Sequence, residues 1–314
     1  MIAVGAVSFV VVAASVTLVL SRQPADPRYR GGSFDVDAYR GFGTWVDAYD
    51  IAAAYQKDGG APPVNTDSVD AMASAGVKTI YLQAARNDSK TPTGLLDATL
   101  LAPFLARAHQ HGMRVIGWST PEMRDVAFDL ERLLMIHRFV HDGERFDGVA
   151  VDIEDNQTVA DSVLRSRHLV ELTKKLRAAV GTNVAIGAIV PPAVQLDVIN
   201  PIYWPAFPWK SIQPYYDVWL PMAYWSERQI ESGYHDAYRY STESVQRMRV
   251  ALGDLAAPVH LIGGIADKIT TTEIAEFTRA VKDSGAIGAS TYDYATSSPT
   301  ELAALRAGIA PIAP

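Results

Sequence analysis

Two acidic residues near the middle of the chain have the spacing that acid catalysis needs. The segment 146–155 reads FDGVAVDIED, and its side chains alternate with the two-residue period of a β-strand. This alternation places Ala150, Asp152 and Glu154 on one face and the intervening aliphatic residues on the other. Two carboxylates held this close cannot both ionise freely, so one of them keeps its proton to higher pH and becomes available as a general acid. Cleavage of a glycosidic bond requires such a group.

A structural role is the alternative for any acidic residue at the end of a strand. Asp155 is interpreted in this way, as a cap of the next helix or as the partner of a basic neighbour. For Asp152 and Glu154 a functional role is favoured, because inward spacing on an apolar strand places two costly charges where only pairing or function would keep them.

The elements that must hold these carboxylates follow the pattern of a (β/α)8 TIM barrel. Short apolar runs typical of strands alternate with longer helical segments, as in a parallel sheet covered by helices. Eight parallel strands close such a barrel, and its catalytic groups gather at the C-terminal strand ends. The expected strands are residues 43–49, 79–84, 114–119, 148–153, 184–190, 218–223, 260–265 and 288–292.

Helices are expected between these strands at residues 67–75, 101–111 and 271–283. Gly76 stands where the first of them should end, and Thr272 is the expected N-cap of the last. A doubly wound open sheet is the alternative fold. Its dinucleotide-binding version requires G-x-G-x-x-G after the first strand, whereas the glycines here precede that strand or lie within it.

At its fourth expected strand the chain resembles the family 18 glycoside hydrolases, the chitinase-like barrels, which read D-G-x-D-x-D-x-E there. Asp147, Gly148, Asp152 and Glu154 match this motif. The resemblance implies that Glu154 is the proton donor. It also implies that Asp152 orients the substrate and tunes the acid.

A second likeness lies on the sixth expected strand, where the family has M-x-Y-D and this chain has MAYW at residues 222–225. It implies that Tyr224 contacts the reacting sugar. The likeness spans roughly residues 40–308. Two positions depart from the family: Ala150 replaces the first inward aspartate, and Trp225 replaces the aspartate after the tyrosine.

The two missing aspartates leave the nucleophile of the reaction open. In the family they support a mechanism in which the substrate's own N-acetyl group is the nucleophile, an exception to the usual scheme of two protein carboxylates. A second protein carboxylate is therefore the alternative. The candidates by position are Asp47, Glu122, Glu227 and Asp293, of which Asp293, at the end of the last strand, is the first to test.

Aromatic and polar residues near strand ends are candidates for binding sugar, because aromatic faces cover the C–H face of a sugar ring and polar groups bind its hydroxyls. Trp204 and Trp209, in a proline-containing segment, are interpreted equally as a binding platform or as core, and Trp219 as core. Gln83, Arg86 and Asn87, around the end of the second strand, either bind hydroxyls or a charged sugar, or terminate the strand. The predicted substrate-binding residues are Trp45, Asp47, Gln83, Arg86, Trp118, Glu122, Trp225 and Tyr292.

The composition excludes several classes of function. A net charge of -7 argues against nucleic acid and acidic membrane surfaces as partners, because both attract basic patches. A neutral polysaccharide or oligosaccharide fits better. The chain has no cysteine, and His137 and His141 lack the glutamate of an H-E-x-x-H metal site. No metal or cofactor is expected, and the protein is expected to be a monomer.

The N-terminal residues form a separate segment. Residues 2–20 are uncharged and aliphatic, and ~20 such residues suffice to cross a bilayer. The expected organisation is a transmembrane or signal-anchor segment at 1–21, a linker at 22–35 and the barrel at 36–314. The expected location is extracytoplasmic, membrane-anchored or secreted, with membrane contact through this helix only. Arginines follow the run and no basic residue precedes it, which the positive-inside rule reads as the opposite orientation.

The function expected from these features is hydrolysis of a cell-envelope or environmental polysaccharide, with Glu154 as general acid/base and Asp152 as assisting carboxylate. The alternative is a non-catalytic carbohydrate-binding protein on a degenerate chitinase-like barrel. Chitinase-like lectins generally lose the glutamate at the position of Glu154. This chain keeps it, which favours an enzyme.

Overall fold

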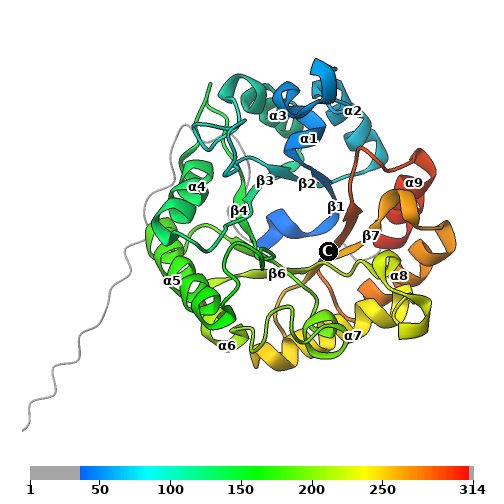
Figure 1. Ribbon diagram of the computed structural model, residues 1–314. Coiled ribbons are helices and arrows are strands. Elements are labelled where there is room, and N and C mark those ends of the chain that lie inside the picture. Colours follow the sequence, from blue (N-terminus) through cyan, green and yellow to red (C-terminus); the bar gives the residue numbers. More distant parts are fainter. Residues whose placement is uncertain (1–35, 311–314) are drawn as a thin grey trace, which may run out of the picture.

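The computed structural model describes residues 36–310, in which eight parallel strands form a barrel with helices around it (Figure 1). Neighbouring strands pair in the order β6-β5-β4-β3-β2-β1-β8-β7. The strands are β1 (Gly41–Val46), β2 (Thr79–Gln83), β3 (Arg114–Ser119), β4 (Gly148–Asp152), β5 (Ile186–Val190), β6 (Val218–Pro221), β7 (His260–Ile265) and β8 (Gly288–Tyr292).

Backbone hydrogen bonds between β6 and β7 bring the two ends of this order together. The Trp219 N–H donates to the Pro258 carbonyl at 2.9 Å, and the Ala223 N–H donates to the Ile262 carbonyl at 2.7 Å. The predicted (β/α)8 barrel is confirmed, and the open doubly wound sheet is excluded. Several strand boundaries differ from the expected ones by one to three residues. The largest difference is at β1, which ends at Val46 because Asp47 caps the next helix instead of extending the strand.

Helices follow each strand and cover the outside of the barrel (Figure 1). They are α1 (Ala48–Ile51), α2 (Thr66–Ala75), α3 (Ala98–Gln110), α4 (Val126–Arg138), α5 (Ser162–Val180), α6 (Trp209–Ile212), α7 (Ala237–Leu252), α8 (Thr271–Asp283) and α9 (Pro299–Ile309). Gly76 ends α2 in the left-handed conformation, as expected, with φ of 90°. The expected cap of α8 is wrong by two residues, because Thr270 forms a capping box with Glu273.

The strands divide the apolar core of the protein into two parts. One fills the inside of the barrel, and the other lies between the strands and the helices. β4 contributes Ala150 to the inner core and Val149, Val151 and the following Ile153 to the outer one. The predicted two-residue alternation is therefore confirmed, and it directs the residues in phase with Ala150 toward the barrel interior.

The N-terminal end of the barrel is closed by a short 3₁₀ helix, η1 (Val36–Tyr39). The Tyr39 hydroxyl donates to the Val149 carbonyl at 3.0 Å, and the Tyr39 carbonyl lies 2.8 Å from Nδ1 of the buried His260. Because this end is plugged by side chains, the opposite end is the one open to a ligand.

The histidines near the end of α4 and the N-terminal segment were both considered from the sequence. α4 ends at Arg138, so His137 lies in the last turn of this helix and His141 lies beyond it. Within residues 36–310 no helix is long and apolar enough to span a bilayer. The expected membrane segment and linker at residues 1–35 lie outside the described residues.

Candidate active site

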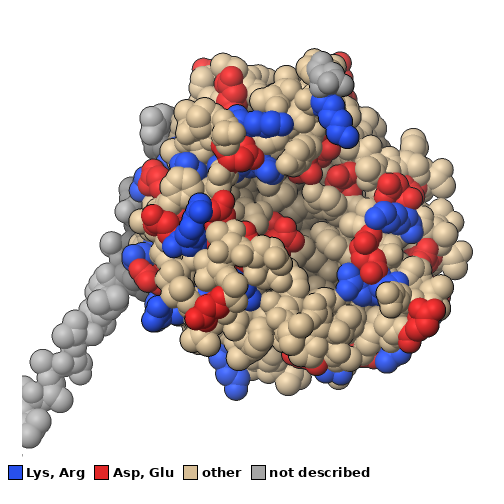
Figure 2. All heavy atoms as spheres, viewed as in Figure 1, with Lys and Arg blue, Asp and Glu red and all other residues tan. Residues whose placement is uncertain are grey.

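A cleft of about 490 Å³ opens at the C-terminal ends of the strands. Figure 2 shows this hollow at the open end of the barrel, with acidic side chains inside it and around its edge. Its floor is the inner core, and its walls are the loops that follow the strands. The predicted site residues that line it are Trp45, Asp47, Gln83, Arg86, Trp118, Glu122, Asp152, Glu154, Tyr224 and Tyr292.

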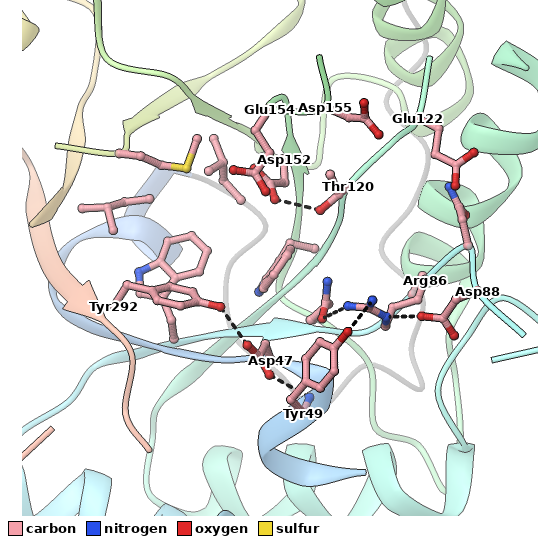
Figure 3. A pocket seen from close by; sticks show the side chains of 18 of the residues that line it. Asp47, Tyr49, Arg86, Asp88, Thr120, Glu122, Asp152, Glu154, Asp155 and Tyr292 are labelled. Atoms are coloured by element: carbon pink, nitrogen blue, oxygen red, sulfur yellow. Dashed lines mark hydrogen bonds and ion pairs between the residues drawn. The ribbon is translucent and has the colours of Figure 1, made fainter. Parts of the chain in front are cut away.

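Asp152 and Glu154 enter the cleft together from the end of β4 (Figure 3). Asp152 is 6% exposed, whereas the side chain of Glu154 is exposed to the cleft. One oxygen of Asp152 accepts a hydrogen bond of 2.7 Å from Thr120, and its other oxygen, Oδ1, is buried without a partner. The pair is thus one deep and one accessible carboxyl group on the same strand.

Burial and like charge both act against ionisation of this pair. Burial raises the pKa of Asp152, the charge of Glu154 raises it further, and the hydrogen bond from Thr120 opposes them. Burial, followed by the charge of Asp155, raises the pKa of Glu154. No lysine, arginine or histidine within residues 36–310 forms an ion pair with either carboxylate. The two groups therefore retain a proton to higher pH than ordinary carboxyl groups do.

Tyrosine and tryptophan side chains form the floor and one wall of the cleft. Trp45 stacks on Tyr81 with ring centroids 4.4 Å apart, and Trp118 meets Trp45 edge-on at 5.9 Å. The indole Nε1 of Trp118 is buried without a partner. Tyr224 lines the same cleft as the β4 carboxylates. Burial, and then the charges of Glu154 and Asp152, raise the pKa of its hydroxyl.

Asp47 lies on the wall formed by β1, across the cleft from β4 (Figure 3). Its Oδ1 accepts hydrogen bonds from the backbone N–H groups of Tyr49 and Asp50, which begin α1. Its Oδ2 accepts a hydrogen bond of 2.8 Å from the hydroxyl of Tyr292. These bonds fix the carboxylate in one orientation facing the cleft.

Arg86 is the one basic residue among those that line the cleft. Its Nε lies 2.6 Å from Asp88, and its Nη1 donates to Gln83 at 3.0 Å. Glu122 lies on the rim, where it accepts a hydrogen bond of 2.9 Å from Arg124. The polar residues after β2 therefore form a network in the cleft wall and do not merely terminate the strand.

Three predicted site residues do not line the cleft. Trp225 is fully buried between β7 and α8, where it packs against Phe277, so its predicted role in substrate binding is wrong. The carboxylate of Asp293 turns away to accept hydrogen bonds from Thr296. Glu227 is paired with Lys268 at 2.7 Å. Among the four carboxylates considered as partners of Glu154, Asp47 and Glu122 remain.

The tryptophans after β5 belong to the core. Trp204 is 1% exposed, its Nε1 donates to Ser166 at 2.9 Å, and the guanidinium of Arg165 covers its ring. Trp209 packs against Phe207 and Trp219. The predicted core position of Trp219 is confirmed, and neither of the other two is a sugar-binding platform.

Several cleft residues were not predicted, and two of them have a clear structural role. Thr120 binds Asp152, and the β3–β4 register, which pairs Ser119 with Val151, would have placed it there. Tyr49 was assigned to the first strand, but it lies in α1 and lines the cleft. Asn87, considered with Gln83 and Arg86 as a candidate for binding sugar, also lines the cleft. The remaining unpredicted lining residues are Ala85, Asp88, Asp155, Ile189, Met222, Ile262 and Ile265.

One group of three acidic residues within residues 36–310 is close enough to hold a metal ion: Asp47, Asp50 and Asp293, with oxygens within 4.8 Å of one another. Each already has a structural partner, since Asp50 accepts a hydrogen bond from the Asp47 N–H and the other two cap turns. Burial, then the charge of Asp47, raises the pKa of Asp50 to about 7. Protonation of Asp50 therefore relieves the repulsion in this group without a cation.

No family model and no curated protein sequence matches the chain. Its fold is similar to that of solved glycoside hydrolases. An endo-beta-1,4-mannanase from Thermotoga petrophila aligns with a TM-score of 0.64 and 13% identity, over 90% of this chain and 78% of that one. The C-terminal domain of a putative chitinase from Desulfitobacterium hafniense aligns with a TM-score of 0.60 and 11% identity, over 87% and 99%. The spore cortex-lytic enzyme SleL from Bacillus cereus aligns with a TM-score of 0.57 and 10% identity, over 85% and 73%. These likenesses establish the TIM-barrel fold that the chain shares with mannanases, chitinases and a cortex-lytic enzyme.

Proposed function

We propose that the protein is a glycoside hydrolase in which Glu154 is the general acid/base and Asp152 the assisting carboxylate. The observation that carries the proposal is the inward pair at the end of β4, which has no cationic partner among the described residues. A buried carboxyl group next to a second carboxyl group, with no cation to compensate it, costs stability, and such an arrangement is typical of a catalytic site.

The accessible member of the pair is suited to proton transfer. Glu154 faces the cleft, and its raised pKa lets it keep a proton that it can donate to the oxygen of the leaving sugar. The deeper Asp152, held by Thr120, is placed to stabilise the positive charge that develops on the sugar ring as the bond breaks. Both roles need the pair to carry one proton when the substrate binds.

The second reacting group is a protein carboxylate on the opposite wall, or a group of the substrate itself. Asp47 is the better placed of the remaining carboxylates, because three hydrogen bonds orient it and no cation within residues 36–310 is paired with it, whereas Glu122 is paired with Arg124. A separation of about 5 Å between the two carboxyl groups accompanies retention of configuration, and about 6.5 to 9.5 Å accompanies inversion.

The charges of the cleft favour an uncharged polysaccharide or oligosaccharide. Its acidic lining residues far outnumber its single arginine, which is itself paired with Asp88. An anionic polymer would be repelled. A cell-envelope or environmental polysaccharide is the substrate class we propose, with the protein extracytoplasmic on the basis of residues 2–20. Fractionation of cells into cytoplasmic, membrane and secreted protein would check this location.

The test is hydrolysis of a polysaccharide panel of mannans, chitins, glucans and peptidoglycan by the purified full-length protein. Release of reducing ends from one of these polymers is expected, and its loss in Glu154→Gln. Equal release by the two proteins would remove Glu154 from the acid role. Binding of a polymer by the native protein without any release would favour the carbohydrate-binding alternative.

A further inference from the structure

The most exposed aromatic ring of the cleft lies away from the catalytic pair. Tyr49 is 51% exposed, whereas Trp45 and Trp118 are 2% and 5% exposed. The two tryptophans can contact a sugar only at the cleft floor. Tyr49 instead presents ring surface to the opening, on the wall opposite Asp152 and Glu154 in Figure 3.

The ring of Tyr49 is held in place from behind. The guanidinium carbon of Arg86 lies 4.9 Å from its centroid, and Nη2 of Arg86 donates to its hydroxyl at 3.3 Å. The ring of Tyr55 meets it edge-on at 5.2 Å. Its backbone N–H donates to Asp47 at 2.7 Å. A ring fixed in this way loses little conformational entropy when a ligand stacks on it.

Arg86 supports this ring and is not free to bind an anion. Its Nε is paired with Asp88, its Nη1 donates to Gln83, and its Nη2 donates to Tyr49. The same Asp88 accepts a hydrogen bond of 2.6 Å from Tyr55. The positive charge is thus neutralised within the protein, and the surface offered to a ligand is an aromatic face with hydroxyl and carboxylate oxygens around it.

We propose that Tyr49 forms a binding subsite for an uncharged sugar unit next to the unit that is cleaved. This inference rests on the proposed function, and it adds that the substrate has two or more sugar units extending from Glu154 toward the loops after β1 and β2. The C–H face of the second sugar stacks on the exposed face of Tyr49. Tyr49 is a binding residue and takes no part in bond cleavage.

The test measures binding without turnover, in the full-length Glu154→Gln protein. Calorimetric titration uses chitopentaose and mannopentaose as neutral probes and pentagalacturonate as the acidic probe. In this background Tyr49→Ala is compared with Tyr49→Phe, which keeps the ring. The matched control is Tyr238→Ala, which removes a tyrosine that also lies under an arginine, Arg279 at 4.2 Å, but on α7 away from the cleft.

We expect one neutral pentasaccharide to bind, and Tyr49→Ala to weaken its binding about threefold to tenfold. Tyr49→Phe and Tyr238→Ala should bind within twofold of the parent protein. The proposal is wrong if Tyr49→Ala binds as the parent does, if no neutral probe binds, or if the acidic probe binds more tightly. The outcome is separate from that of the hydrolysis test, because a protein that stacks sugar on Tyr49 but never cleaves it keeps the subsite and loses the enzymatic function.

Discussion

The two ends of β4 carry acidic residues in opposite electrostatic situations. At the N-terminal end, Asp147 is fully buried, and its Oδ2 accepts a hydrogen bond of 2.8 Å from the Val115 N–H and lies 3.0 Å from Nε2 of His109. The other ring nitrogen of His109 lies 2.6 Å from Glu144. Burial of these charges is compensated by direct partners on neighbouring elements.

At the C-terminal end, five residues further along, no cation among the described residues compensates the acidic side chains. Asp152 has one hydrogen bond, from Thr120, and a buried oxygen without a partner, and Glu154 adds a second negative charge beside it. The comparison separates the acids of this strand that are stabilised by direct partners from those that are buried at a cost in stability, as the proposed chemistry requires. The paired end closes the fold, and the unpaired end faces the cleft.

The largest expected effect is that of Glu154→Gln on catalysis. We expect kcat/KM to fall about 10²- to 10⁴-fold, the usual contribution of a positioned general acid. The free energy of unfolding should stay the same or rise, because the substitution removes a charge next to Asp152. Steady-state kinetics and urea denaturation measure the two effects. Glu227→Gln, at a glutamate outside the cleft, is the control, and an equal fall in both variants would contradict the assignment.

Asp147→Asn should reduce stability and leave activity unchanged, the reverse of Glu154→Gln. We expect the free energy of unfolding to fall by about 2 to 3 kcal/mol, since a buried hydrogen-bonded charge beside His109 is lost. The folded fraction should keep the native kcat/KM. Urea denaturation and kinetics on the same sample check both parts. A variant as stable as the native protein, or one that is folded and inactive, would contradict a purely stabilising role for Asp147.

Asp152→Asn should move the pH dependence of activity. In the native protein the pair loses its shared proton only at a pH above the ordinary carboxyl range, because burial and like charge raise both pKa values. Without a second carboxylate beside it, the one remaining acid should lose its proton at a lower pH than that at which the native pair loses its last proton. The alkaline limb of kcat/KM should therefore shift to lower pH, together with a reduced maximum. An alkaline limb that stays in place would show that the two carboxyl groups do not share a proton.

The smallest expected effect is on the pH dependence of stability at the paired end. Burial acts to lower the pKa of His109, but the hydrogen bonds and charges of Asp147 and Glu144 outweigh it and raise this pKa above 6.5. Between pH 6.5 and the pKa of His109 in the folded state, the folded protein binds more protons than the unfolded protein. The stabilisation by protonated His109 is therefore fully present below pH 6.5 and is lost as pH rises through the folded-state pKa. The unfolding free energy of the native protein should decline over this window, and His109→Gln should flatten the decline. Equal slopes in the two proteins would contradict the prediction.

The sequence predicts the barrel and the pair of carboxylates that enters the cleft from β4, because both depend on local periodicity. Alternation along 148–153 sets the facing of Asp152 and Glu154, and Gly76 marks a helix end, before any long-range contact is known. The same alternation would also have excluded Trp225 and Asp293. Each directly follows a cleft tyrosine at the end of a strand, and its side chain points away from the cleft.

The wall opposite β4 was less predictable. Tyr49 lies on a four-residue helix whose start depends on the capping box of Asp47 and Asp50, and the apolar pattern there also suited a strand. The network from Tyr49 through Arg86 to Asp88 joins the loops after β1 and β2, and such loop contacts have no periodic signal in the sequence. The loop residues proposed to bind sugar therefore needed the structure, whereas the two carboxylates proposed for catalysis, which follow a strand's periodicity, did not.

The most direct test of proton donation by Glu154 compares leaving groups. Native protein and Glu154→Gln are assayed on aryl glycosides of the cleaved sugar with phenyl and 2,4-dinitrophenyl leaving groups. Dinitrophenolate departs without protonation, so we predict a large loss of kcat/KM on the phenyl glycoside and near-native rates of bond cleavage on the dinitrophenyl glycoside. The same loss on both substrates would show that Glu154 does not protonate the leaving oxygen.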